Sequence, residues 1–223
     1  MLDLNPIILT ALLASVTTTI LLFLGTPIAW WLANAKSRLK PVVETLTALP
    51  LVLPPTVLGF YLLILLNPNS VLGKFWIDIT GNTLTFSFSG LVIASVFYSL
   101  PFMVQPLQRA FQEMGKKPLE IAASLGASPR DAFFTVALPT CKRGFLTSIA
   151  LTFAHTVGEF GVVLMVGGNI PGETKVLSIA IYEYVETMQY QEAHKLSAGL
   201  LIFSFAALFA LYSSDQKSLV RIG

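Results

Sequence analysis

Stretches without a charged residue recur along the whole chain and are separated by short polar segments. Asp, Glu, Lys and Arg are absent from residues 4–35, 45–73, 79–108 and 196–214. A fifth apolar stretch, residues 144–168, is interrupted only by His155 and Glu159. Because a spanning helix needs about 20 consecutive apolar residues, each of the five stretches predicts one helix that crosses a bilayer.

The composition favours a membrane protein over a soluble one. Hydrophobic residues make up 54% of the 223 residues and charged residues 12%, about half the charged share of a soluble domain. A soluble all-α protein with large buried helices would need a longer chain to hide so many apolar runs from water. We therefore expect an all-α, polytopic transmembrane helical bundle that forms a single domain over residues 1–223. Its spans are expected at about residues 8–33, 45–66, 88–109, 144–167 and 195–213.

The basic residues divide unequally between the two sides that such a topology defines. On one side we count Lys36, Arg38, Lys40, Arg109, Lys116, Lys117, Arg130, Lys142, Arg143, Lys217 and Arg221. On the other side lie only Lys74, Lys175 and Lys195. Since basic loops stay in the cytoplasm, we expect a multi-pass protein of the cell membrane with its N-terminus outside and its C-terminus in the cytoplasm. The loop over residues 110–143 is then cytoplasmic, and residues 176–190, too polar to span, form a short external helix.

The second span contains three prolines within six residues. Pro50, Pro54 and Pro55 remove backbone donors and clash with the preceding turn, so we expect the helix to break there. A broken backbone survives at membrane depth only where protein or a water-filled cavity satisfies it. The segment around Pro54, Pro55 and Thr56 is therefore either part of a transport path or a tight joint between helices.

The fourth span carries a carboxylate between glycines, in the sequence Gly158-Glu159-Phe160-Gly161. An ionisable residue at this depth indicates a functional site by default. A structural role is the alternative that we favour, in which Glu159 pairs with His155 one turn back or caps a neighbouring helix. A metal site is not expected, because a third ligand and a His-Glu-x-x-His run are absent and Cys141 is the only cysteine.

The loop between the third and fourth spans predicts two short capped helices. Pro118 suits the start of the first helix, and Glu120 places a negative charge in its first turn. Gly126 can end that helix, after about Leu125, in a left-handed conformation. The second helix should open at Ser128-Pro129-Arg130-Asp131, a Ser-x-x-Asp cap, and close at Leu138-Pro139.

This pair of helices could read DNA, lie on the membrane surface or dock a soluble partner. A DNA-reading second helix carries several basic and amide side chains, whereas Arg130 is the only one here. We therefore expect no nucleic-acid partner.

The loop resembles the signature of ABC-importer permeases, which runs Glu-Ala-Ala, three residues, Gly, nine residues and then an aliphatic residue, any residue, Leu-Pro. Here these positions hold Glu120-Ile121-Ala122, Gly126 and Val136-Ala137-Leu138-Pro139, and only Ile121 departs from the pattern. Segments 49–55, 158–161 and 169–174 are similar to those of molybdate permeases. Gly-Glu-Phe-Gly is shared with sulfate permeases, and Asn-Ile-Pro-Gly-Glu-Thr is closer to the molybdate branch.

The resemblance to this sulfate/molybdate transport family implies a type I ABC importer permease fold and a homodimer of two permease copies. Members receive an oxyanion, here molybdate or tungstate, from an external binding protein, and two cytoplasmic ABC ATPase subunits drive them by alternating access. The chain has no Gly-x-x-x-x-Gly-Lys-Ser/Thr loop. We thus expect it to be no enzyme and to bind no cofactor itself, while the partner ATPase uses ATP and Mg.

Two sets of residues follow as candidates for function. The resemblance implies that the loop is a coupling helix with ATPase-coupling residues Pro118, Glu120, Ile121, Ala122, Ala123, Leu125, Gly126, Leu138 and Pro139. The outer surface of the bundle is expected to contact membrane lipid. For the translocation path or gate we propose Pro54, Pro55, Thr56, Ser95, Ser99, Thr156, Gly158 and Glu159.

Three other functions remain open on sequence. A sulfate or thiosulfate permease would differ only in its substrate. An intramembrane enzyme using His155 and Glu159 would need a third catalytic group and would act without ATP. A purely structural membrane anchor would leave the capped loop without a purpose.

Overall fold

The computed structural model describes residues 4–216, and Lys217 and Arg221, which were counted in the charge split, lie outside the described residues. Within this range the chain is helical and has no β-strand. Its elements are α1 Asn5–Asn34, α2 Lys40–Ala48, η1 Leu49–Leu51, α3 Pro55–Leu65, α4 Val71–Thr80, α5 Phe88–Met114, α6 Lys117–Ser124, α7 Pro129–Ala132, η2 Phe133–Ala137, α8 Leu138–Thr140, α9 Lys142–Gly158, α10 Gly161–Gly167, α11 Leu177–Glu186 and α12 Tyr190–Gln216.

Three helices, α1, α5 and α12, are long and apolar enough to cross a membrane unaided. Two further spans are broken. The helices on either side of Pro54 meet at 111°, and α9 and α10 meet at 60°. Counting each bent pair as one span gives five, so the expected polytopic helical bundle of about five spans is confirmed.

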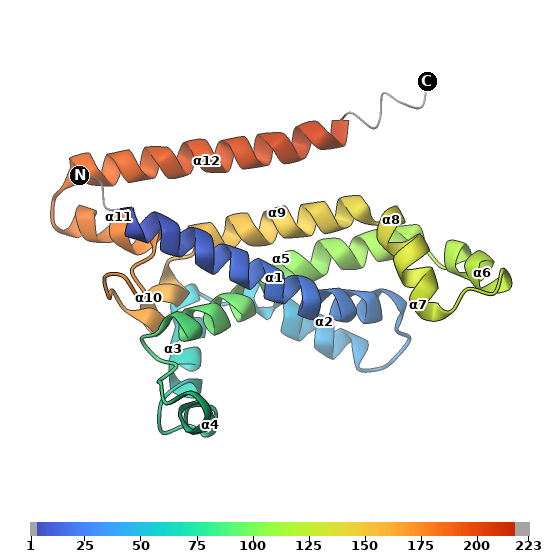
Figure 1. Cartoon of the computed structure of the whole chain (residues 1–223), viewed down its shortest axis with the longest axis horizontal. Coiled ribbons are helices and arrows are strands. Elements are labelled where there is room, and N and C mark those ends of the chain that lie inside the picture. Colours follow the sequence, from blue (N-terminus) through green and yellow to red (C-terminus); the bar gives the residue numbers. More distant parts are fainter. Residues whose placement is uncertain (1–3, 217–223) are drawn as a thin grey trace.

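The centre of the bundle is formed by α1, α5 and α9, which pack against one another (Figure 1). Helices in a membrane associate through close packing, because lipid offers no hydrophobic driving force between them, and small residues permit it. A Cβ atom on Gly25 would lie 2.7 Å from Met103 Cγ, and one on Gly144 would lie 2.3 Å from the Cβ of Ala110. Glycine at these two positions therefore lets α1 and α9 reach α5.

The two broken spans meet each other at their breaks. A Cβ atom on Gly161, at the start of α10, would lie 2.8 Å from the Cβ of Pro55, at the start of α3. One turn further along α3, a Cβ on Gly59 would lie 2.8 Å from that of Met165. Helices α3 and α10 therefore pack closely just beyond the breaks, whereas Pro54, Pro55 and Thr56 themselves are exposed. The close contact agrees with a joint between helices, and the exposure of the proline segment is compatible with a transport path.

The loop over residues 110–143 projects from one end of the bundle as the short helices α6, α7, η2 and α8 (Figure 1). The second helical run ends at Thr140, one residue beyond the predicted Leu138-Pro139. The chain passes through a π-helical turn, η2, and continues as α8, where Cys141 N donates to Ala137 O at 2.9 Å. A π-turn shifts the hydrogen-bond pattern by one residue, so the proline, which lacks an N–H, is accommodated without a break.

Candidate functional site

A buried carboxylate lies at the break between α9 and α10. Glu159 ends α9 in an extended conformation and is 3% exposed. Two serines of α5, one turn apart, face it: Ser95 Oγ donates to Glu159 Oε2 at 2.6 Å, and Ser99 Oγ donates to Oε1 at 2.6 Å. His155 Nδ1 lies 3.5 Å from Oε1. Both carboxylate oxygens are therefore held by groups on α5 and α9.

The hydrogen bonds of Ser99 determine which of its neighbours act as hydrogen-bond donors. Its Oγ also lies 2.9 Å from Thr156 Oγ1 and 2.9 Å from His155 Nδ1. A hydroxyl has one proton and a carboxylate accepts hydrogen bonds, so the Ser99 proton points to Glu159. Thr156 and His155 must then donate to the Ser99 oxygen. His155 consequently carries a proton on Nδ1 in this network.

Aromatic rings and helix α11 enclose the same cluster. The His155 ring stacks on Phe102 at a centroid distance of 3.9 Å and lies 4.8 Å from the ring of Tyr98. On the other side, Ser178 of α11 donates its hydroxyl to the backbone oxygen of Glu159. The break is thus covered both from within the bundle and from α11.

Among the predicted path residues, the structure brings together Ser95, Ser99, Thr156 and Glu159. All four are buried and bonded to one another, so in this conformation the hydroxyls face the carboxylate. Pro54, Pro55 and Thr56 lie at the neighbouring break, where Pro55 contacts α10, and Gly158 is exposed with open space around its Cα. Their place in a path stays a prediction.

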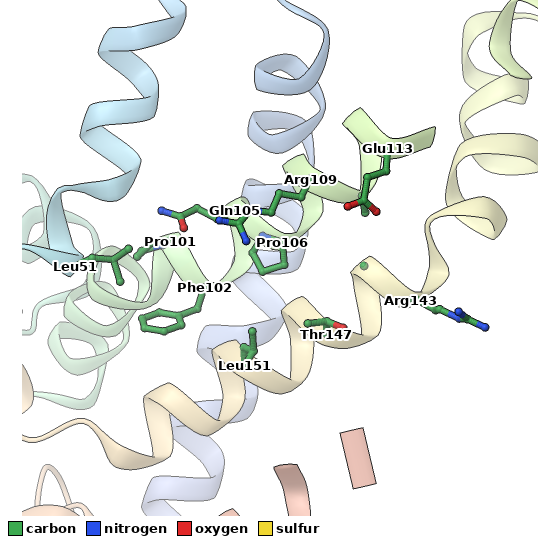
Figure 2. Close-up of a pocket in the computed structure, with 12 residues that line it drawn as sticks. Leu51, Pro101, Phe102, Gln105, Pro106, Arg109, Glu113, Arg143, Thr147 and Leu151 are labelled. Carbon is green, nitrogen blue, oxygen red and sulfur yellow. The ribbon is translucent and has the colours of Figure 1, made fainter. Parts of the chain in front are cut away.

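A cavity of about 710 Å³ opens beside this cluster, between α5, α9 and η1 (Figure 2). Its apolar end is formed by Leu51, Pro101, Phe102 and Leu151. Its polar end carries Gln105, Arg109, Glu113, Arg143 and Thr147. Phe102 separates the cavity from His155, since it lines the one and stacks on the other. In the sequence, Arg109 and Arg143 count only toward the membrane topology, and no pattern singles out Gln105 or Thr147.

The loop between α5 and α9 is capped at the two positions that its sequence predicted. Gly126 has φ +88°, Ala127 N donates to Ala122 O, and Gly126 N donates to Ala123 O, each at 3.0 Å. This pair of bonds is the Schellman motif that ends a helix. Ser128 and Asp131 form a reciprocal capping box that opens α7. The predicted caps of both helices are confirmed.

The exposure of side chains on α6 defines an outward apolar face. Ile121 and Leu125, one turn apart, are 61% and 83% exposed, while Glu120 and Ala123 are also exposed. Ala122 is buried within the loop itself. A partner that docks on α6 would therefore meet Ile121 and Leu125, whereas Ala122 supports the packing beneath them.

Within residues 4–216, no group of three His, Cys, Asp or Glu side chains is arranged to hold a metal ion. His155 and Glu159 instead bind each other and the hydroxyls of Ser95 and Ser99.

Comparison with known proteins gives consistent matches over most of the chain. Residues 25–216 match the family model described as binding-protein-dependent transport system inner membrane component. The chain is 58% identical to the molybdenum transport system permease protein ModB of Azotobacter vinelandii over 214 residues, covering 96% of this chain and 95% of that protein. It is 34% identical to the sulfate transport system permease protein CysT of Synechocystis sp., covering 95% and 73% respectively.

A solved structure has the same fold. The inward-facing MetNI methionine ABC transporter matches with a TM-score of 0.72, covering 97% of this chain and 95% of the matched chain, at 17% identity. At that identity the likeness concerns the fold alone.

Proposed function

The chain belongs to the family of binding-protein-dependent transport system inner membrane components, and from that premise we propose that it is the permease subunit of an ATP-driven ABC importer for molybdate. The proposed substrate rests on the 58% identity to a molybdenum transport permease over nearly the full length of both chains. A sulfate permease is similar at 34%, which makes sulfate the second candidate.

The partners of the proposed importer are a second copy of this chain, two ATPase subunits and an external binding protein. The ATPase would dock on the capped α6 through Ile121 and Leu125, whose side chains are largely exposed. The unequal division of Lys and Arg supports a cytoplasmic position for this loop. The N-terminus then lies outside the cell.

The loop connects directly to the two helices that flank the cavity. It leaves α5 at Met114 and enters α9 at Lys142. Because α6 is closed by a Schellman motif and α7 is opened by a capping box, the loop can act as a rigid lever. Closure of the two ATPase subunits would move α5 and α9 relative to each other, and these helices also carry Ser99 and His155.

We assign the described conformation to an inward-facing state of the alternating-access cycle. The cavity is polar toward Arg109 and Arg143 and ends at Phe102 and Leu151. Beyond Phe102, the Glu159 cluster and α11 close the way to the other side. Opening toward the binding protein would require the bonds of Ser95 and Ser99 to Glu159 to break or shift together.

The proposed substrate is tested with the complete complex in proteoliposomes. Binding protein loaded with molybdate is expected to stimulate ATP hydrolysis, and excess sulfate is expected to leave that stimulation intact. Tungstate, which has the same shape and charge, should substitute for molybdate. If sulfate-loaded binding protein alone stimulates hydrolysis, the chain is a sulfate permease and the molybdate proposal falls.

A further inference from the structure

The cavity lies on the face of α5 that points away from α1. Met103, Val104 and Leu107 of α5 pack in the core against α1. Gln105 and Arg109 lie on the opposite side of the same helix and line the cavity (Figure 2). A polar face at this position in a membrane protein has to meet water, a ligand or another polar group. The cavity is therefore suited to water or a polar solute, and its lining can select between solutes.

The charges of this lining are not neutralised within residues 4–216. Neither Arg109 nor Arg143 has an ion pair there, and Glu113 is the one carboxylate among the lining residues. Figure 2 shows the Arg109 side chain extending along α5 toward Gln105, while Arg143 points away from the centre of the cavity. The lining thus carries a net positive charge, with Arg109 beside an amide.

An arginine with neutral donors is suited to a tetrahedral oxyanion. A guanidinium presents a planar fork of N–H donors that binds two oxygens of one anion. Gln105 adds an amide donor from α5, and Thr147 adds a hydroxyl from α9. A water molecule takes about 30 Å³ of liquid volume, so a cavity of about 710 Å³ holds an oxyanion together with many waters. Binding in such a wet site is weak and reversible, as release requires.

We propose that Arg109, Gln105 and Thr147 form an inward-facing oxyanion site, which the transported dianion occupies after it passes Phe102 and before it leaves the protein. The assignment rests on the proposed function. Arg143, at the rim on α9, attracts the anion through its long-range field. Glu113, one turn beyond Arg109 on α5, repels it and keeps the affinity low.

Binding to this site can be measured without transport. The permease–ATPase complex is placed in nanodiscs of neutral lipid, without ATP and without binding protein, and equilibrium binding of radiolabelled molybdate is recorded. Wild type should bind saturably, with competition by tungstate and sulfate but not by chloride at equal ionic strength. R109Q should weaken binding by about tenfold or more, since a charged donor pair is lost. R109K should fall between, because it keeps the charge and loses the fork.

The matched control is R38Q, which removes an exposed arginine from the α1–α2 connection, outside the cavity. Its molybdate binding should equal that of wild type. If R109Q does not assemble, as judged by size exclusion and basal ATP hydrolysis, Q105L and T147V decide, and each should weaken binding by about threefold or more. Equal binding in R109Q and wild type, or in both Q105L and T147V and wild type, would overturn the site.

The phosphate of a lipid headgroup is also a tetrahedral oxyanion and could occupy the same cavity. Nanodiscs with and without anionic lipid distinguish the two ligands. If anionic lipid abolishes molybdate binding to wild type as effectively as R109Q does, the cavity is a headgroup site and the proposal is wrong. The proposed function has a separate readout, which is the stimulation of wild-type ATP hydrolysis by molybdate-loaded binding protein. If wild-type stimulation is normal but R109Q binds molybdate as tightly as wild type, the oxyanion site is refuted and the proposed function is not.

Discussion

Replacing Ser99 with alanine should destabilise the protein more than replacing Ser95. Ser99 Oγ contacts three groups, Glu159, Thr156 and His155, whereas Ser95 Oγ bonds Glu159 alone. S99A leaves one carboxylate oxygen short of a donor and the buried Thr156 hydroxyl without its acceptor. S95A removes one donor and leaves no other side chain unpaired.

The magnitudes follow from the environment of the bonds. Side-chain hydrogen bonds between spanning helices average about 0.6 kcal/mol and reach about 1.7 kcal/mol, while bonds to charged groups in proteins contribute about 1.5–3 kcal/mol. We therefore expect S95A to cost about 1–2 kcal/mol and S99A about 2–3 kcal/mol. In a double-mutant cycle, S99A and E159Q should couple by at least about 1 kcal/mol.

The assay is reversible unfolding in mixed micelles, followed by tryptophan fluorescence. S148A is the matched control, because Ser148 is a fully buried serine of α9 whose hydroxyl has no hydrogen-bond partner in the described part of the chain. Its removal should change the free energy of unfolding by less than about 0.5 kcal/mol. The reasoning is refuted if S95A costs as much as S99A, or if S99A and E159Q are additive.

Three further predictions concern local features. G126L should abolish substrate-stimulated ATP hydrolysis while membrane insertion persists, because Gly126 has a φ of +88°, which leucine rarely adopts, although there is open space around it. G126N should keep activity, since asparagine tolerates that conformation. Substrate-stimulated hydrolysis that survives in G126L would exclude a coupling role for the Gly126 turn. G144A should lower the free energy of unfolding by about 1–3 kcal/mol, because the added Cβ forces α9 away from α5. G158A is the control, since a Cβ there meets nothing within 4 Å, and an equally small effect of both variants would contradict the close α5–α9 packing. Hydrogen bonds from Lys175 and Asn169 lower the pKa of Glu183. This contact therefore stabilises fully above about pH 4.3 and is lost as the pH falls through the lowered folded-state pKa. The hydrogen-exchange protection factors of residues 169–176, which are corrected for the intrinsic pH dependence of exchange, should stay constant from pH 7 to 5 and fall in E183Q; a fall in wild type within that range would oppose this prediction.

Features that depend on neighbours along the chain were predictable from sequence. The cap at Gly126 and the capping box at Ser128 follow from local backbone chemistry, and the structure has both. The stop expected at Leu138-Pro139 lies one residue from the observed end at Thr140. The π-turn upstream of it, Phe133–Ala137, was not predicted, because no local residue pattern indicates such a turn. Charge-free stretches predicted the spans for the same local reason.

Features that depend on distant residues were only partly predictable. The spacing of His155 and Glu159 placed them on one helix face, and the structure pairs them at 3.5 Å. The serines that complete the cluster come from α5, more than fifty residues away, and helix periodicity does not indicate which face meets which. Gln105 and Thr147 became candidates only once α5 and α9 were seen to flank one cavity.

Uptake of radiolabelled molybdate into proteoliposomes tests the central claim most directly. The liposomes contain this chain and its ATPase partner, with the binding protein outside and ATP inside. We predict accumulation against a gradient that requires ATP and the binding protein and that is lost in the double variant I121D/L125D, which places charges on the docking face of α6. Uptake at the same rate without ATP, or in liposomes that lack the ATPase, would contradict the account.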